Sequence, residues 1–571
     1  MPSILTTNPL CLTSSYHNSR SMDAILGEVS SRPQVVLRQG VLVGVRLSEA
    51  LPQPIDAFLG VPYALPPIGD RRFRPAARIP SSSTTVDASK YGPAAPGKQL
   101  RPGVGPELTY SEDCLTANIF RPNLQPDPSS KRLPVAVYIH GGAFNRGTSS
   151  MHNTASMVSH SEEPFVAVSF NYRIGALGFL PSAVTAKEGA LNLGLRDQAH
   201  LLEWVHENVA AFGGNPDDVT LIGLSAGAHS IGHHLMHFKD GVAPLFHRAV
   251  IESGAPTSRA VRPFHAEIHE EQFRDFLREV GCPENLSEDE IFPFLRRQSI
   301  ETISAAQAAV FDKYNPSLRW AFQPVIDQDI IPRPPIETWA LGRWHKVPIM
   351  TGFNGNEGSL YVEKTMAKSS EFVDFFRELL PLLSEDDLQT IDELYPDPAK
   401  STDSPYIETR PGLGAQYKRI EAAYGHYAYV APSRQTAELA SAAQNHPVYL
   451  YHWALITSVE DGARHGDNMK YEVCDPAVCA LSPAQKELAG TLNAYITSFI
   501  TKGDPNAVRG PYSNRPKWEP YDKSRPKAML LGGGNEELIG GGVGKTAELV
   551  DDEWGRKECQ FWWSKVDLSQ Q

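Results

Sequence analysis

The sequence predicts an α/β protein with a large, mostly parallel central sheet that has helices on both faces. Short apolar runs rich in β-branched residues alternate with segments of helical periodicity, and this alternation is typical of a parallel sheet. No internal repeat and no low-complexity linker divides the chain. The composition agrees, because 41% hydrophobic and 21% charged residues are ordinary for a globular chain of 571 residues.

The middle of the chain supplies most of the expected sheet. "LPVAVYIHGG" and "PFVAVSFNYR" predict buried strands at 133–142 and 164–173, because both are continuous apolar runs. Helical spacing of Leu and Val predicts a helix over 195–212, which Gly213 ends. "DDVTLIG" predicts a strand that ends at Gly223, and "AGAHSIGHHLMHF" predicts the next helix. "HRAVIESG" and "KVPIMTGFNG" predict two further strands.

The segments on either side of these strands are expected to form helical insertions and a terminal tail outside the sheet. Residues 260–345 and 360–445 are rich in helical patterns and predict insertions over the sheet edge, with Ser384 as a helix N-cap. We expect one domain over 33–571, preceded by a loose Ser-rich tail at 1–32.

Charge and hydropathy exclude two classes of partner. The formal charge is 53 − 66 = −13 and no basic stripe offsets it, so nucleic-acid binding is not expected. No stretch approaches about 18 uninterrupted apolar residues, so no membrane span is expected. The N-terminus lacks a basic region followed by an apolar segment, which predicts a cytoplasmic protein.

No motif predicts a metal or an organic cofactor. The six cysteines are scattered, and Cys474 and Cys479 form a C-x4-C without a second pair, so we interpret them as free thiols. "GGGVGKT" at 540–546 resembles the end of a phosphate loop, but Ile539 stands where the pattern needs glycine. We therefore expect a surface loop there.

Ser225 is the candidate nucleophile. It lies in "GLSAGA", the only G-x-S-x-G of the chain, between a predicted strand and a predicted helix. Such a strand–turn–helix exposes a serine hydroxyl above the sheet, and the helix N-terminus favours developing negative charge. His229, His233, His234 and His237 follow on the same predicted helix, where a structural role explains them better than catalysis.

A second motif, "HGGAF" at 140–144, directly follows a predicted strand. A glycine-rich loop in that position exposes backbone N–H groups that can stabilise an oxyanion.

The chain resembles the type-B carboxylesterases, a family that includes cholinesterases and many fungal esterases and lipases. The resemblance extends from about residue 33 to near the C-terminus, and it implies an α/β-hydrolase fold. The motifs that carry it occur in the family's order: "FLGVPYALPPIGDRRFRP", "SEDCLTANIFRP", "HGGAF", "NYRIGALGFL", "FGGNP" and "GLSAGA".

The resemblance implies the remaining site residues. The family's acid is a glutamate in a loop after a strand, which matches Glu357 in "GFNGNEGS", and its base matches His465 in "ARHGDNMKYEV". The oxyanion donors would then be the N–H groups of Gly142, Ala143 and Ala226. These residues imply a serine ester hydrolase that acts through an acyl-enzyme and needs no cofactor.

Departures from the family bear on the substrate. Leu224 stands where the family commonly has glutamate, Ala143 where it often has glycine, and 86–113 contains no tryptophan like the one that binds cationic alcohols in cholinesterases. We therefore expect neutral or mildly polar small-molecule esters rather than choline esters, although Trp320 or Phe322 can supply an aromatic face. The family's early disulfide is not expected, because no cysteine lies between residues 12 and 113 to pair with Cys114.

Three alternatives remain at this stage. The same residues could transfer an acyl group to a substrate hydroxyl or amine, or open a lactone. The protein could also be a non-catalytic binding member of the family, which the intact candidate residues disfavour. An intracellular ester of secondary metabolism is the expected substrate, and the sequence does not specify the oligomeric state.

Overall fold

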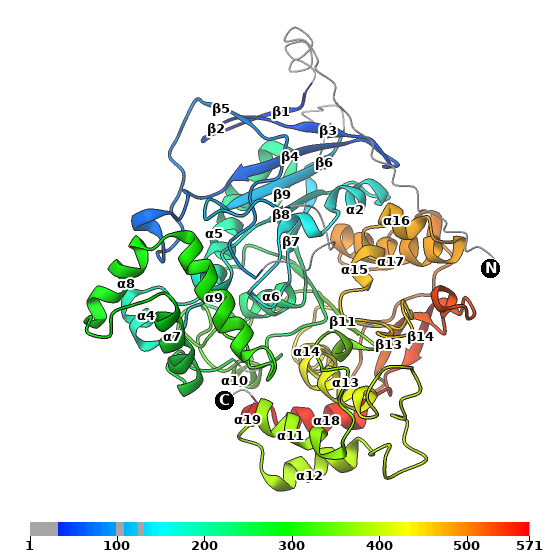
Figure 1. Ribbon diagram of the computed structural model, residues 1–571. Helices are drawn as coiled ribbons and strands as arrows, with labels where there is room; N and C mark the ends of the chain where they lie inside the picture. Colours follow the sequence, from blue (N-terminus) through cyan, green and yellow to red (C-terminus); the bar gives the residue numbers. More distant parts are fainter. Residues whose placement is uncertain (1–31, 99–107, 124–130, 260, 570–571) are drawn as a thin grey trace, which may run out of the picture.

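The computed structural model describes residues 32–98, 108–123, 131–259 and 261–569 (Figure 1). The tail expected at 1–32 falls almost entirely on residues 1–31, which lie outside the described residues. Its last residue, Arg32, donates from Nε to the carbonyl oxygen of Gly44 at 2.7 Å and therefore belongs to the folded part.

A twisted sheet of 11 strands forms the centre of the described structure. The neighbouring strands from β13 to β8 are parallel, whereas β14 at one edge and β6, β4 and β3 at the other are antiparallel. In spatial order the strands are β14 (Lys545–Asp551), β13 (Lys527–Gly533), β12 (Val448–Trp453), β11 (Ile349–Asn354), β10 (Arg248–Glu252), β9 (Gly214–Leu224), β7 (Leu133–Ile139), β8 (Val166–Phe170), β6 (Thr116–Pro122), β4 (Ile55–Pro62) and β3 (Val45–Leu47). A smaller sheet contains β1 (Gln34–Leu37), β2 (Gly40–Val43) and β5 (Thr85–Asp87).

Helices surround the large sheet and extend below it in Figure 1. Their bounds are α2 (Thr154–His160), α3 (Gly175–Gly178), α4 (Ala183–Glu188), α5 (Leu193–Asn208), α6 (Ala226–Met236), α7 (Glu267–Glu279), α8 (Glu288–Arg297), α9 (Ile300–Tyr314), α10 (Pro335–Leu341), α11 (Ser369–Leu379), α12 (Glu385–Leu394), α13 (Tyr417–Gly425), α14 (Ala431–Ala443), α15 (Asn468–Glu472), α16 (Pro476–Cys479), α17 (Pro483–Lys502), α18 (Arg556–Ser564) and α19 (Val566–Ser569). A π-helix, η5 (His426–Val430), joins α13 to α14.

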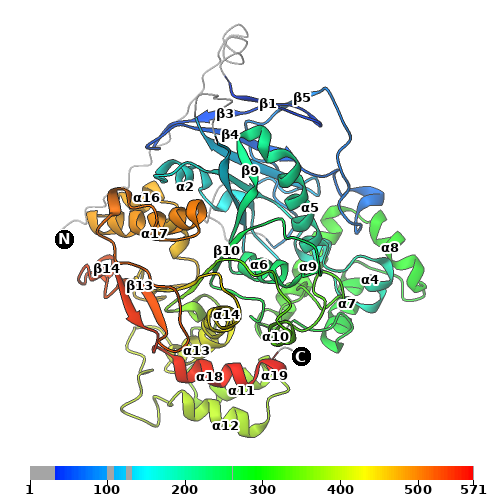
Figure 2. The same cartoon turned by 180° about the vertical axis from the view of Figure 1, so that it is seen from behind.

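Two hydrophobic cores lie on opposite faces of the sheet, because successive side chains of a strand point to opposite sides. In β7, Val135 and Val137 enter one core together with side chains of α5, α6 and α14. Ala136 and Tyr138 enter the other core, which α2 and α17 cover. Figures 1 and 2 show α2 and α17 on one side of the sheet and α5 and α6 on the other. Burial of both strand faces explains the continuous apolar runs in the sequence.

The predicted fold class is confirmed, with helices on both faces of a mostly parallel sheet. The insertions expected at 260–345 and 360–445 contain α7–α10 and α11–α14. Ser384 is the N-cap of α12 and accepts from the N–H of Asp387.

The expected surface loop at 540–546 is wrong in part. Lys545 and Thr546 begin β14, which pairs antiparallel with β13, so the glycines at 540–544 belong to a hairpin connection. Within the described residues, no helix is long and apolar enough to cross a membrane.

Candidate active site

Ser225 lies in a sharp turn between the end of β9 and the start of α6. Its backbone is held at φ +59° and ψ −123°, a conformation that L-residues rarely adopt. Two backbone hydrogen bonds hold this turn. The Ser225 N–H donates to the Glu252 carbonyl at 2.9 Å, and its own carbonyl accepts from the His229 N–H at 2.9 Å. Strain that the surrounding structure enforces is typical of a functional turn.

Glycines allow the loop after β7 to contact this turn directly. A Cβ added to Gly227 would lie 2.0 Å from the carbonyl oxygen of Ile139 at the end of β7. A Cβ on Gly141 would lie 2.7 Å from the Leu224 carbonyl oxygen and 3.1 Å from Ser225 Cβ. The "HGGAF" loop and the serine therefore come together only because both positions lack side chains.

The loop after β7 directs its carbonyl groups into internal hydrogen bonds. The Gly142 carbonyl accepts from the N–H groups of Asn145 and Arg146, and the Ala143 carbonyl accepts from Asn145 Nδ2. By contrast, the N–H groups of Gly142, Ala143 and Ala226 donate to no oxygen in the described part of the chain. Gly142 has φ +114° and Ala143 has φ +56°, so this is another conformation that favours glycine. These three free donors adjoin Ser225.

A buried acid–base pair follows β11 and β12. Glu357, 1% exposed, begins the 3₁₀ turn η4 (Glu357–Leu360) directly after β11. Its Oε2 is 2.5 Å from His465 Nδ1, and its Oε1 accepts from the Asn354 N–H at 2.7 Å. His465 Nε2 is buried and has no hydrogen-bond partner among the described residues, so the Ser225–His465 hydrogen bond is not formed in this state. A Cβ on Gly466 would lie 3.3 Å from Leu224 Cδ2, which places the histidine loop beside the residue before the serine.

A buried network holds the histidine loop. Asn354 Nδ2 donates to the Arg464 carbonyl at 2.7 Å and also contacts Asn468 Oδ1 at 3.3 Å. Asn468 Nδ2 and the Tyr451 hydroxyl in turn donate to Glu252 Oε1 at 3.0 and 3.2 Å. Burial, with the charge of Glu472 acting in the same direction, raises the pKa of Glu252 well above its ordinary range. The network thus connects the strand ends of β10, β11 and β12 beneath the candidate triad.

Aromatic residues that the sequence analysis did not select lie against the histidine. The ring centroids of Tyr429 and Tyr361 are 4.5 and 5.4 Å from that of His465. Tyr361 directly follows η4, so its position four residues after Glu357 could have indicated that it lies near the site. Tyr429 lies in η5, and no nearby sequence motif indicates its place beside His465. Trp320 is 5% exposed and Phe322 is 1% exposed.

The histidines after Ser225 lie where the helical pattern placed them. His229, His233 and His234 are buried within α6, and His237 is its C-cap. Burial lowers the pKa of both His233 and His234 to about 3, so both are neutral near pH 7. His229 Nδ1 is within 3.1 Å of the Ala255 carbonyl oxygen.

The candidate residues come together at the carboxyl ends of neighbouring parallel strands. The oxyanion loop follows β7, Ser225 follows β9, Glu357 follows β11 and His465 follows β12. Among the described residues, no group of three or more His, Cys, Asp or Glu side chains is arranged to hold a metal ion. A serine, three free N–H donors and a carboxylate-paired imidazole are the groups that acyl transfer needs.

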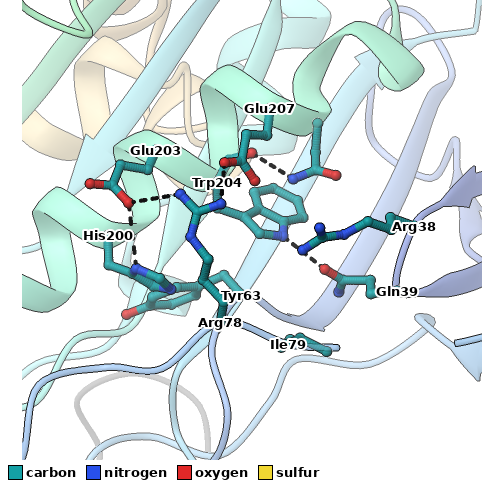
Figure 3. A pocket seen from close by; sticks show the side chains of 10 residues that line it. Arg38, Gln39, Tyr63, Arg78, Ile79, His200, Glu203, Trp204 and Glu207 are labelled. Carbon is teal, nitrogen blue, oxygen red and sulfur yellow. Dashed lines mark hydrogen bonds and ion pairs between the residues drawn. The ribbon is translucent and has the colours of Figure 1, made fainter. Parts of the chain in front are cut away.

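A separate surface hollow of about 30 Å³ lies beside α5 (Figure 3). Its lining includes Arg78, which is 2.6 Å from Glu207 Oε1, and Trp204, whose Nε1 donates to Gln39 Oε1 at 2.9 Å. None of the candidate residues lines this hollow. Among the described residues that line it there is no serine and no oxyanion loop, so it offers no comparable chemistry.

The chain is similar to known proteins over most of its length. The carboxylesterase family matches residues 31–562. "Secreted lipase 4" of Gibberella zeae is 35% identical over 90% of this chain and 88% of its own length, and "Phenmedipham hydrolase" of Pseudarthrobacter oxydans is 30% identical over 86% and 94%. The crystal structure of EstA from Aspergillus niger is similar with a TM-score of 0.79 at 28% identity, and the similarity covers 95% of this chain and 99% of EstA.

Proposed function

The chain belongs to the carboxylesterase family and is a carboxylic ester hydrolase, and from this premise we propose that Ser225, His465 and Glu357 are its catalytic triad. The N–H groups of Gly142, Ala143 and Ala226 form the oxyanion hole. Acyl transfer would replace water by a substrate hydroxyl or amine as the acceptor, whereas a lactone is opened with water. We propose water as the acceptor.

In the proposed mechanism, Ser225 Oγ attacks the ester carbonyl carbon while its proton passes to His465 Nε2. The oxyanion hole stabilises the negative oxygen, and Glu357 stabilises the imidazolium. The tetrahedral intermediate collapses, and the leaving alkoxide takes the proton from Nε2 and departs as the alcohol. Water then attacks the acyl-enzyme and gives its proton to Nε2, and the carboxylic acid leaves as Ser225 recovers that proton.

The observation that carries the proposal is the buried Glu357–His465 pair, 2.5 Å long, beside a strained serine turn with three free N–H donors. Such a pair fixes the imidazole with Nε2 free to act as a base. It also disfavours a purely binding role, because a strained turn and a buried carboxylate cost stability without contributing to binding.

The test is a fluorophosphonate label followed by peptide mass spectrometry, together with the Ser225→Ala variant. We expect the label on Ser225 alone and a loss of about 10⁴–10⁶-fold in kcat for 4-nitrophenyl butyrate, with the melting temperature nearly unchanged. Label on another serine in a folded protein contradicts the assignment.

We also propose that neutral or mildly polar esters are hydrolysed in preference to choline esters. The aromatic face that Trp320 offers is covered by the guanidinium of Arg259, whose central carbon is 3.8 Å from the ring centroid. A substrate cation would therefore meet a positive charge rather than an open π-face. The comparison to make is kcat/KM for butyrylcholine against 3,3-dimethylbutyl butyrate. A preference of about tenfold for the charged ester would exclude this specificity.

The compartment is a separate proposal, and we place the protein in a reducing, intracellular setting with a metabolite ester as substrate. The cysteines of the described residues support it, because Cys114, Cys282, Cys474, Cys479 and Cys559 are all unpaired. Cys11 lies outside the described residues. Thiol titration of the denatured, non-reduced protein from its native source should find six free thiols. A disulfide would argue for an exported protein, as the name of the Gibberella zeae relative describes.

A further inference from the structure

Beside the proposed triad lies a cation that has no acidic partner among the described residues. The Arg259 guanidinium stands over Trp320 and is 5.5 and 5.4 Å from the ring centroids of Tyr361 and Tyr429. It donates one hydrogen bond, to the Tyr429 hydroxyl. Its Nε is buried without a hydrogen-bond partner, and within the described residues no carboxylate pairs with it. We call this set of four residues the Arg259 cage.

Two more arginines, in the insertion at 260–345 that directly follows Arg259, have no acidic partner in the described structure. Arg262 is 9% exposed, and Arg319 has a buried Nε without a hydrogen-bond partner. Burial is the main cause that lowers the pKa of Arg262 to about 10, and the charge of Arg319 acts in the same direction. The Arg262 guanidinium still carries a positive charge near pH 7.

Four other buried arginines pair with a carboxylate, and a fifth, Arg515, donates to backbone carbonyl oxygens, among the described residues. Arg173 is 2.6 Å from Asp197 and Arg434 is 2.7 Å from Asp552, and in both pairs the side chains are almost fully buried. A buried charge without a partner is costly, and this chain has an excess of acidic residues with which to pair it. An unpaired arginine cluster therefore indicates that the neutralising anion comes from outside the chain.

The cage adjoins the reacting bond through its two tyrosines. Tyr361 and Tyr429 contact both the Arg259 guanidinium and the His465 ring. A positive charge at this place opposes formation of the imidazolium while a neutral ester reacts. An anion bound to Arg259 neutralises that positive charge. A negatively charged substrate is therefore bound more tightly, and its transition state is stabilised as well.

We propose that the Arg259 cage binds a carboxylate of the ester substrate, with Arg262 and Arg319 adding positive potential. The preferred substrates are then esters with a second, free carboxylate, on either the acyl or the alcohol half. The planar guanidinium suits a carboxylate because it can donate two parallel hydrogen bonds. This inference rests on the proposed function and narrows the range of preferred substrates. Neutral esters are still hydrolysed, but less efficiently than their anionic isosteres.

The test compares kcat/KM for matched esters in two arms. The acyl arm sets the 4-nitrophenyl monoester of glutaric acid against its neutral methyl diester, and the alcohol arm sets 4-butyryloxybenzoate against its methyl ester. We expect the wild-type enzyme to prefer the anionic ester in at least one arm by about tenfold or more, and salt at about 0.5 M to weaken that preference. A neutral preference in both arms overturns the proposal.

Variants separate recognition from packing. Arg259→Met keeps the length of the side chain over Trp320 and should lower kcat/KM for the favoured anionic ester about tenfold while changing the neutral isostere less than about threefold. Arg259→Lys should retain part of the preference. The matched control is Arg343→Met, an arginine over the Phe238 ring at 5.6 Å that pairs with Asp240, and it should change neither ester. Equal losses for both esters in Arg259→Met would mean a structural role only.

The inference and the proposed function fail differently. If wild-type protein hydrolyses none of the four esters and the fluorophosphonate does not label Ser225, the triad assignment itself is wrong. If Ser225 is labelled and neutral esters are hydrolysed without an anionic preference, only the carboxylate site is wrong. The wild-type comparison stands without any variant, so a poorly folded Arg259→Met leaves the proposal testable.

Discussion

Replacing Glu357 by glutamine tests how the proposed triad works, because the carboxylate serves two donors at once. Its oxygens accept from His465 Nδ1 at 2.5 Å and from the Asn354 N–H at 2.7 Å. An amide has only one oxygen, so one of these donors must face an NH₂ group.

The cost of each arrangement follows from the burial of the site. If the amide oxygen faces His465, the N–H of Asn354, a residue that is 0% exposed, is left without an acceptor, which costs about 1–3 kcal/mol. If the oxygen faces Asn354, the NH₂ group faces Nδ1, and the ring proton moves to Nε2. Nε2 then cannot accept the Ser225 proton. The second arrangement is favoured, and the amide has no charge to stabilise an imidazolium.

We therefore expect Glu357→Gln to lower kcat by about 10³–10⁴-fold, equivalent to about 4–5.5 kcal/mol in the activation free energy. The assay is hydrolysis of 4-nitrophenyl butyrate at saturating concentration, with melting temperatures to show that the variant folds. The fluorophosphonate labelling rate should fall in parallel, since labelling uses the same base.

The matched control is Glu421→Gln, a second buried glutamate, which contacts Asn356 Nδ2 at 3.3 Å. Burial raises the pKa of Glu421 to about 8, so this side chain is already mostly neutral at pH 7 and an amide replaces it closely. Its kcat should stay within about twofold of wild type. If Glu357→Gln also kept kcat within about tenfold, the carboxylate would not set the tautomer of His465 and the reasoning would fail.

Three further predictions concern the oxyanion loop, the serine turn and stability. Ala143→Gly should relieve a residue held at φ +56° and widen the site, so kcat/KM for tert-butyl butyrate should rise relative to n-butyl butyrate; an unchanged ratio contradicts this. Gly227→Ala would place a Cβ 2.0 Å from the Ile139 carbonyl oxygen, and we expect a loss of about 1–3 kcal/mol in unfolding free energy by urea denaturation, together with reduced activity; wild-type stability would refute the close contact. Glu421 keeps a proton in the folded state up to about pH 8 that it releases near its ordinary pKa of 4.5 when unfolded, so its stabilising contribution is complete below pH 4.5 and is lost as the pH rises toward 8. The unfolding free energy should therefore fall by up to about 1.4 kcal/mol per pH unit in that window, and a Glu421→Gln variant with the wild-type slope would show that another group is responsible.

The sequence predicts the parallel centre of the sheet well, because strands buried on both faces leave continuous apolar runs such as 133–139. The edge strands are harder to predict. Lys545 and Thr546, the first two residues of β14, were expected to be in a loop, because the half-buried residues of β14 do not form a continuous apolar run and pairing with β13 specifies this strand.

Some residues of the candidate site can likewise be predicted from local sequence, and others cannot. Ser225 and the oxyanion loop have local signals, namely glycines where the backbone must approach closely. Glu357 and His465 were reached only through the resemblance to a family. Arg259 and Tyr429 have no local signal at all, because their importance comes from contacts across segments that are far apart in the sequence.

The order of the strands also fixes when the site can exist during synthesis. The serine turn and the oxyanion loop are complete once β10 has formed, because the Ser225 N–H donates to the Glu252 carbonyl, but His465 follows β12, more than two hundred residues later in the chain. A nascent chain therefore contains the serine and its oxyanion donors long before a base is present to activate the serine. A chain that ends before β12 lacks His465. It has no base to activate Ser225, so it can neither hydrolyse esters nor be acylated on Ser225.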